Sequence, residues 1–364
     1  MQFEVNVSDV AGITLQLRSY SQVIHAANVR LPCPSKALGY FSMPSKYSII
    51  ICTRNRALTL ADALESHLVL EIPTGVSRDI TVVDNGSSDQ TAAVVGAFAG
   101  RAGFSVSYVR EERTGHSIAL NTGCRAANGE VLVFTDDDAF PERGWLAAIH
   151  DAFVSHHCDW VFGPVVPIWN GAKPNWYGPE TSAQVACLDY GDKLFVARDP
   201  STTFFGVNHA CRRERLFQIG LYDERLGLRD EWSFRGNDDD LYHKAIAKNF
   251  IIIYSPDVRV NHLIAEHRYM KKTHLRNAWV TGRNHAIFSN DRFANSRQWF
   301  GTPRYIYRFL ISHIIYWMQS NVRRNPSKAF YHRLRITRCV ALVWYGFREW
   351  AKRQFHSTIQ NERF

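Results

Sequence analysis

Apolar runs and amphipathic stretches alternate along the chain between residues 47 and 134. The apolar runs predict strands at 47–53, 80–83, 106–109 and 131–134, and the stretches between them predict helices at 58–68, 90–99 and 117–127. Continuous apolar runs of this length are typical of strands buried on both faces, as in a parallel sheet. Strands that alternate with helices at this pitch predict an α/β fold with a doubly wound, mostly parallel sheet flanked by helices.

Shorter elements follow as far as residue 262. We expect helices at 145–153, 212–217 and 237–248, and strand-like apolar runs at 160–168, 204–210, 250–254 and 258–262. The irregular stretch after 168 contains Trp169, Trp176 and Tyr177. These rings could stack on sugars, or they could anchor the loop to the core.

The pattern divides the chain into three regions. Residues 1–46 alternate weakly and end in a proline-containing linker, so we expect a short extension that bears strands. Residues 47–265 form the predicted α/β domain. Residues 266–364 are basic and rich in aromatic residues, and we expect a helical C-terminal appendage with apolar segments at 305–318 and 339–347.

The net charge of +9 is unevenly distributed. From residue 259 to the end there are 20 Lys and Arg but 4 Asp and Glu, so the remainder of the chain is acidic overall. Such a tail predicts an anionic surface nearby, and Trp and Tyr beside Arg suit a membrane interface. The alternative is a pair of helices packed on the protein or on a partner subunit, with the basic face in solvent. We recognise no nucleic-acid-binding signature, so nucleic acid is not an expected partner.

The seven cysteines and the lengths of the apolar segments indicate the cellular compartment of the protein. The cysteines are scattered, without the spacing of a zinc or redox pair, and suggest reduced thiols. No run approaches the ~20 apolar residues of a membrane span, and the start lacks a signal-peptide pattern. We therefore expect a cytoplasmic protein, peripheral on the inner face of the cell membrane.

Two acidic clusters carry the candidate chemistry. Residues 136–138 are three consecutive aspartates directly after the fourth strand, at the sheet edge where α/β proteins bind ligands. Adjacent carboxylates repel one another, so the cluster suggests a divalent metal with phosphate on its far side, and the alternative is a solvated acidic loop. Asp238 and Asp239 form the second cluster, which could also be an ordinary helix start capped by Asn237. No glycine-rich phosphate-binding loop follows any predicted strand, so we expect phosphate to be bound through a metal ion.

Collinear motifs over residues 47–265 resemble the family 2 glycosyltransferases, which have a GT-A fold and are bacterial-type and inverting. The matching segments are 51–56, 82–91, 121–123 with 129–130, 134–138, 208 with 212–213, 222–224, 236–241 and 260–262.

The resemblance implies roles for individual residues. Thr53, Arg56, Asp84, Asn121 and Asp136 correspond to nucleotide-binding positions. The resemblance also implies a metal site for Mn²⁺ or Mg²⁺. Asp136 and Asp138 fall on the family's metal-binding Asp-x-Asp motif, and His262 corresponds to a further metal ligand. Asp238 matches the catalytic base, with Asp239 as the alternative because Asn237 replaces the usual Glu.

These observations predict a metal-dependent, inverting glycosyltransferase. We expect it to move a sugar from a UDP-sugar to a saccharide or lipid-linked acceptor. The Gln-x-x-Arg-Trp motif of the processive synthases is missing, so we expect one sugar per encounter. Two alternatives stay open at this point: a nucleotidyltransferase that makes the sugar nucleotide, and a non-catalytic glycan-binding protein.

Overall fold

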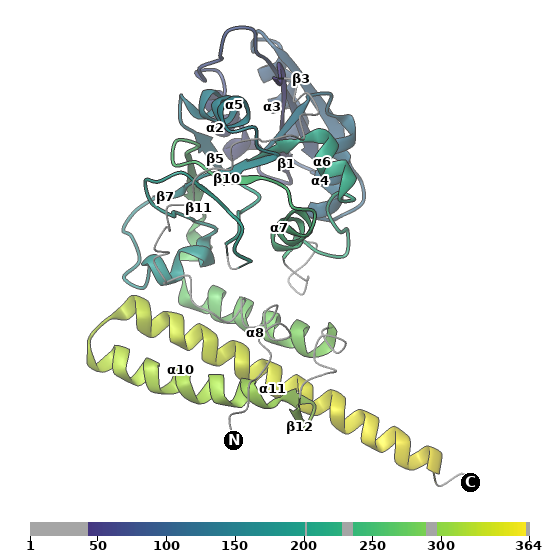
Figure 1. The fold of residues 1–364 in the computed structure, drawn as a ribbon, viewed down its shortest axis with the longest axis vertical. Helices are drawn as coiled ribbons and strands as arrows, with labels where there is room; N and C mark the ends of the chain where they lie inside the picture. Colours follow the sequence, from purple (N-terminus) through teal and green to yellow (C-terminus); the bar gives the residue numbers. More distant parts are fainter. Residues whose placement is uncertain (1–42, 201, 228–235, 289–296, 362–364) are drawn as a thin grey trace. The chain divides into compact units, whose positions relative to one another are not determined.

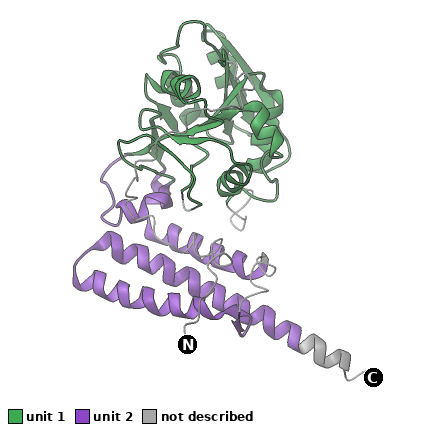
Figure 2. Ribbon diagram, viewed as in Figure 1, with its two compact units in different colours: residues 1–18, 22–169, 186–264 green, residues 19–21, 170–185, 265–364 purple. Residues whose placement is uncertain are grey.

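The computed structural model describes residues 43–200, 202–227, 236–288 and 297–361, with side chains as far as 354. The strands predicted within residues 1–42 lie outside this part of the chain. The described residues form two compact units (Figure 2). Unit 1 contains residues 43–169 and 186–264, and unit 2 contains residues 170–185 and 265–361. The aromatic stretch 170–185, which the sequence pattern placed in the α/β domain, packs in unit 2.

Unit 1 is built on an eight-stranded sheet (Figure 1). The spatial order is β3-β2-β1-β4-β9-β6-β10-β8, and the neighbours β3, β2, β1 and β4 are parallel. The strands are β1 (Lys46–Thr53), β2 (Ser77–Asp84), β3 (Ser105–Arg110), β4 (Val131–Asp136), β6 (Trp160–Phe162), β8 (Phe195–Val196), β9 (His209–Arg212) and β10 (Ile252–Tyr254). The mostly parallel α/β sheet predicted from the sequence is confirmed.

Helices connect the strands of this sheet. They are α2 (Ala57–Ser66), α3 (Thr91–Ala99), α4 (His116–Ala126), α5 (Trp145–Ser155), α6 (Arg213–Gln218) and α7 (Asn237–Ala247). Helix α4 approaches the sheet closely, since a Cβ atom on Gly123 would lie 2.7 Å from Cγ2 of Ile50. This contact explains why the helix carries glycine on the face that meets β1.

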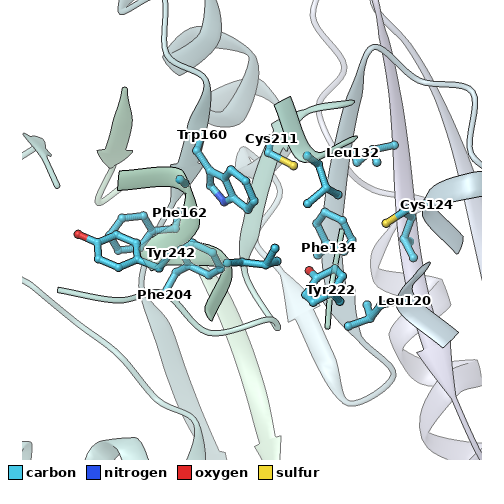
Figure 3. Packing of buried hydrophobic residues seen from close by; sticks show 14 of the residues in the cluster. Leu120, Cys124, Leu132, Phe134, Trp160, Phe162, Phe204, Cys211, Tyr222 and Tyr242 are labelled. Carbon is cyan, nitrogen blue, oxygen red and sulfur yellow. The ribbon is translucent and has the colours of Figure 1, made fainter. Parts of the chain in front are cut away.

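The strand predicted at 204–210 begins only at His209. Residues 204–208 are irregular, with a turn at 206–207, and β9 then runs antiparallel between β4 and β6. Phe204 is buried in this segment, where its ring stacks on Trp160 with ring centroids 5.3 Å apart. Tyr222 and Tyr242 join the same aromatic core (Figure 3). Since Tyr242 lies on α7, the core fixes that helix against the sheet.

A second, three-stranded sheet has the order β5-β11-β7, with β5 (Ala139–Pro141), β7 (Val165–Trp169) and β11 (Val260–Ile264). The apolar run 160–168 therefore supplies β6 to one sheet and β7 to the other. The break is at Gly163, where a Cβ atom would overlap the carbonyl oxygen of Val258. Strand β11 pairs with β5 directly after the aspartate triplet and so brings His262 opposite Ala139.

Unit 2 is mainly helical. Its elements are η2 (Pro179–Val185), η3 (Glu266–Tyr269), α8 (Lys271–Phe288), β12 (Gln298–Trp299), β13 (Thr302–Pro303), α10 (Arg304–Val322) and α11 (Pro326–Asn361). Helix α11 packs against both α8 and α10 (Figure 1). The two segments predicted at 305–318 and 339–347 are parts of longer helices, because polar and basic residues extend both helices past their apolar centres.

Trp176 is one of the loop aromatics for which sugar stacking was an alternative. Its side chain is buried, and its Nε1 donates to the carbonyl oxygen of Tyr269 at 2.8 Å. The ring also packs against Phe330 of α11, with centroids 5.1 Å apart. Trp176 thus anchors its loop within unit 2. Among the described helices, none is both long enough and apolar enough to cross a membrane.

Candidate active site

The carboxyl ends of three parallel strands place polar side chains side by side. In the strand register, Thr53 at the end of β1 pairs with Asp84 at the end of β2, and Cys52 pairs with Asp136 at the end of β4. The loop after β1 is tied to the loop after β2, since the backbone N–H of Asn55 donates to Ser87 Oγ at 2.9 Å. This edge of the sheet is where the sequence placed the candidate site, and the aspartates do gather there.

Asp137, the middle residue of the triplet, holds the loop after β1. Thr53 Oγ1 donates to its Oδ2 at 2.7 Å, and the Arg56 guanidinium pairs with its Oδ1. Burial raises the pKa of Asp137 to about 6, although the charge of Arg56 opposes this shift. Thr53 and Arg56, expected to contact a nucleoside, therefore bind a carboxylate of their own chain in this structure.

Asp138 lies between a cation and an imidazole. Its Oδ2 is 2.8 Å from Arg56 Nη2, and its Oδ1 is 3.2 Å from His262 Nε2. Burial alone would raise the pKa of Asp138, but the hydrogen bond and charge of His262, together with Arg56, lower it to about 2. Asp138 is therefore a carboxylate at neutral pH. It shares one oxygen with Arg56 and turns the other toward His262.

Asp136, Asp138 and His262 come together as a possible metal site. One ligand atom from each residue lies within 4.8 Å of the other two. His262 Nδ1 is buried and has no hydrogen-bond partner among the residues that the structure describes. Two carboxylates and an imidazole form a donor set that suits a divalent cation, and the imidazole favours Mn²⁺ over Mg²⁺. The three ligand positions expected from the sequence thus fit such an ion.

The side chain of Asp84 is buried, and both of its carboxylate oxygens accept hydrogen bonds from other residues of the chain. Its Oδ2 accepts a hydrogen bond from the Tyr108 hydroxyl at 2.6 Å, and its Oδ1 accepts one from the backbone N–H of Ser87 at 2.7 Å. Arg110 Nη1 lies 3.4 Å from the same carboxylate. These contacts hold the loop after β2 against the end of β3.

Asn121 has a similar structural position on α4. Its Nδ2 donates to the carbonyl oxygen of Tyr222 at 2.9 Å, and its Oδ1 accepts from the backbone N–H of Tyr222 at 3.0 Å. Both ends of the amide thus bind the loop that follows α6. The side chain is also buried, so in this structure it positions the loop.

Asp238 lies in the first turn of α7. The backbone N–H of Gly206 donates to its Oδ2 at 2.9 Å, whereas Oδ1 is shielded from solvent and lacks a hydrogen-bond partner among the described residues. Burial raises the pKa of Asp238 to about 7, with smaller contributions from the charges of Asp239 and Asp136. A helix N-terminus favours the ionised form of an acid in its first turn, but burial outweighs that effect at Asp238.

The residues next to Asp238 on α7 have different bonding partners. Thr203 Oγ1 donates to Asp239 Oδ1 at 2.8 Å, and Asp240 forms an ion pair with Lys244 at 2.6 Å. Asn237 is the first residue of α7, and the N-cap residue is Gly236, with φ +116°. The alternative in which Asn237 caps the helix is therefore wrong. Among the described residues, Asp238 is the one of these three acids with a buried oxygen that has neither a hydrogen bond nor an ion pair, since the buried oxygen of Asp240 pairs with Lys244.

Comparisons with known proteins decide the family. The family described as glycosyl transferase family 2 matches residues 48–220. A PGL/p-HBAD biosynthesis glycosyltransferase of Mycobacterium bovis is 33% identical over 191 residues, which cover 52% of this chain and 67% of that protein. The chain belongs to glycosyl transferase family 2. It is therefore a glycosyltransferase, as the motifs predicted.

Two further similarities extend over more of the chain. The glucosyl-dolichyl phosphate glucuronosyltransferase of Haloferax volcanii is 25% identical over 232 residues, 61% of this chain and 71% of that protein. The structure of the mannosyltransferase PcManGT from Pyrobaculum calidifontis, in complex with GDP-Man and Mn²⁺, matches with a TM-score of 0.54 and 18% identity, and covers 84% of this chain and 88% of that one. This likeness confirms the expected GT-A-like fold.

Three site residues of this family 2 glycosyltransferase escaped the sequence analysis. Asp137 was seen only as part of an acidic run, whereas in the structure it lies in the turn after β4 and is bound by Thr53 and Arg56. Gly206 supplies a backbone donor to Asp238, and a Cβ atom there would lie 3.0 Å from Asp238 Oδ1. Thr203 binds Asp239. Neither the glycine nor the threonine had a sequence signal, because their partner lies more than 30 residues away.

Proposed function

We propose that this glycosyltransferase is metal-dependent and inverting, and that it transfers one sugar per encounter from a UDP-sugar to a saccharide or lipid-linked acceptor. One observation carries the proposal. Asp136, Asp138 and His262 converge at the end of β4, while the buried carboxylate of Asp238 lies close enough for the charge of Asp136 to raise its pKa. A cation site beside a separate carboxylate that titrates near neutral pH is what such a transfer requires.

Asp136, Asp138 and His262 would hold the cation. When bound there, a divalent metal offsets the negative charge on the departing nucleoside diphosphate. Asp138 can serve it through the oxygen that faces His262, while Arg56 keeps the other oxygen. The relative from Pyrobaculum, whose fold is similar, was solved with GDP-Man and Mn²⁺, which supports a nucleotide sugar and a divalent ion as the ligands to test.

Asp238 would act as the general base. Its Oδ1, which has no hydrogen-bond partner within the described part of the chain, takes the proton of the acceptor hydroxyl while the hydroxyl oxygen bonds to the anomeric carbon, from the face opposite the leaving group. The bond from the anomeric carbon to the diphosphate oxygen breaks, and its electron pair leaves with the nucleoside diphosphate. A pKa of about 7 suits this role, since an efficient base titrates near the working pH. Asp239 is the weaker candidate because Thr203 occupies one of its oxygens.

The remaining residues would shape the donor site. We propose that Asp84 and Asp136 face the nucleoside, as the family motifs imply, and that Thr53 and Arg56 line the same edge while they remain bound to Asp137. For Asn121 we propose an indirect role, in which it fixes the loop at Tyr222 beside the donor.

The acceptor is proposed from the relatives and from charge. The Haloferax relative is named a glucosyl-dolichyl phosphate glucuronosyltransferase, and this name supports a lipid-linked acceptor here. A basic C-terminal region would hold the enzyme at the anionic membrane surface where such an acceptor lies.

A ligand-binding experiment tests the donor half of the proposal. Thermal stability is measured with UDP-, GDP-, dTDP- and CMP-sugars, each with and without Mn²⁺. We expect stabilisation by a UDP-sugar that requires Mn²⁺ and disappears in Asp138→Ala, because ligands that bind only the folded state raise its stability. Stabilisation by a sugar linked to another nucleotide would replace UDP as the proposed donor nucleotide. No stabilisation by any of these donors would refute the proposed site.

The catalytic half is tested by three matched variants of α7. Asp238→Asn should lower kcat by about 10²–10⁴-fold, the usual contribution of a general base, and leave donor binding intact. Asp240→Asn is the control, because its carboxylate pairs with Lys244 on the same helix. A large loss in Asp239→Asn with an active Asp238→Asn would transfer the role to Asp239.

A further inference from the structure

The outer face of helix α10 carries an apolar stripe. Ile311, Ile315, Met318 and Val322 are 59%, 48%, 56% and 84% exposed. Their spacing of four, three and four residues puts them on one side of the helix. We call these four residues the α10 stripe.

The opposite side of α10 is already buried within unit 2. Ile306, His313 and Ser320 are buried, and they lie half a turn away from the stripe. Helix α11 packs between α8 and α10, so α10 is the outer helix of this layer (Figure 1). A surface helix normally presents a polar outer face, but the outer face of α10 carries four exposed apolar side chains. We therefore expect an apolar surface outside the chain to cover the stripe.

The charges around the stripe indicate which partner. Helix α10 contains no Asp or Glu. Arg304 and Arg308 precede the stripe, Arg323 and Arg324 follow it, and all four are exposed. The guanidinium of Arg304 lies 4.3 Å from the ring centre of Trp299, which is itself about half exposed. Residues 265–364 hold 19 Lys and Arg against 4 Asp and Glu, a net charge of +15.

We propose that the α10 stripe docks on an anionic phospholipid membrane, with α10 lying in the plane of the interface. Apolar side chains flanked by Arg, Trp and Tyr suit this boundary, where acyl chains receive the stripe and phosphates receive the arginines. A second copy of the chain fits less well, because a symmetric contact would bring the same arginines together. The inference deepens the membrane attachment proposed above, on which it rests, by naming the face that docks, and it does not depend on the sugar transfer.

An environment-sensitive dye tests where the stripe goes. The full chain with Ile315→Cys is labelled with an NBD fluorophore, and Leu58→Cys on α2, where Leu58 is 85% exposed, is the matched control. The six cysteines of the described region are buried, and labelled wild type gives the blank. Vesicles contain phosphatidylcholine with or without phosphatidylglycerol.

We expect a blue shift at position 315 only with the anionic vesicles, weakened by salt, and none at position 58. A dye at 315 that is already shielded before vesicles are added would overturn the proposal, since the chain itself or a second copy would then cover the stripe. No shift with anionic vesicles would overturn it equally.

Vesicle co-sedimentation gives an independent measurement on the unlabelled protein. We expect the double variant Ile315→Ser, Met318→Ser to lose affinity by about tenfold or more for each side chain, and Leu58→Ser to bind like wild type. Arg304→Gln should lose about fivefold, on anionic vesicles alone. Unchanged sedimentation of the double variant would refute docking through α10. The assay contains no sugar nucleotide, so its failure is distinct from failure of the proposed activity.

Discussion

Asp238→Asn should make the protein more stable at alkaline pH even though it removes the proposed base. The wild-type carboxylate is shielded, and one oxygen lacks a hydrogen-bond partner among the described residues. An amide is uncharged at every pH, so the variant avoids the cost of burying a negative charge. The prediction links the site chemistry directly to the free energy of unfolding.

The magnitude follows from the pKa of Asp238, which burial raises from 3.8 to about 7. The unfolded chain releases this proton near pH 4 and the folded chain near pH 7. The folded state thus binds more protons in that window, and its stability falls as pH rises through it. Each pKa unit corresponds to about 1.4 kcal/mol, so two units between pH 5 and pH 7 cost about 3 kcal/mol. Above the folded pKa the loss is complete.

Thermal unfolding from pH 5 to pH 8, in the presence of a chelator, measures this difference. The gain of Asp238→Asn over wild type should grow across the range by about 6–12 °C, the shift that about 3 kcal/mol produces in a domain of this size. An unpaired amide adds a cost that does not vary with pH, so the slope is the test. Asp240→Asn should show no such slope, because its carboxylate forms a partly exposed pair with Lys244. A difference between Asp238→Asn and wild type that is constant with pH would refute the reasoning.

Two further predictions concern the surroundings of the site. Gly206→Ala places a Cβ atom 3.0 Å from Asp238 Oδ1 and should reduce kcat by about tenfold because it displaces the carboxylate. Gly96→Ala is the control, since a Cβ atom there meets nothing within 4 Å, and its kcat should equal that of wild type. Equal rates for the two variants would show that the carboxylate tolerates the shift. His262→Ala should raise the Mn²⁺ concentration for half-maximal thermal stabilisation with the donor by about tenfold or more, and an unchanged titration would exclude His262 as a ligand.

Much of unit 1 could be predicted because its signals are local. Apolar runs bounded by polar residues identified the strands β1 to β4, and the family resemblance assigned Thr53, Asp84 and Asp136 to one nucleotide site. The structure places these residues at the same edge of the sheet because parallel strands end there. The start of the strand predicted at 204–210 was misplaced because Phe204 is buried by aromatic stacking in an irregular segment. Burial by itself does not distinguish such a segment from a strand.

The sequence by itself determined the α/β pattern, the family motifs and the chemical identity of the metal-site candidates. Only the tertiary structure decided how those residues are occupied, because each pairing joins segments that are distant in the chain. Asp137 binds Thr53 across 84 positions, and Gly206 meets Asp238 across 32. The pKa of Asp238 depends on the burial that the folded core imposes on α7. The α10 stripe became visible only when α11 was seen to cover the opposite side of the helix, since solvent exposure is a property of packing.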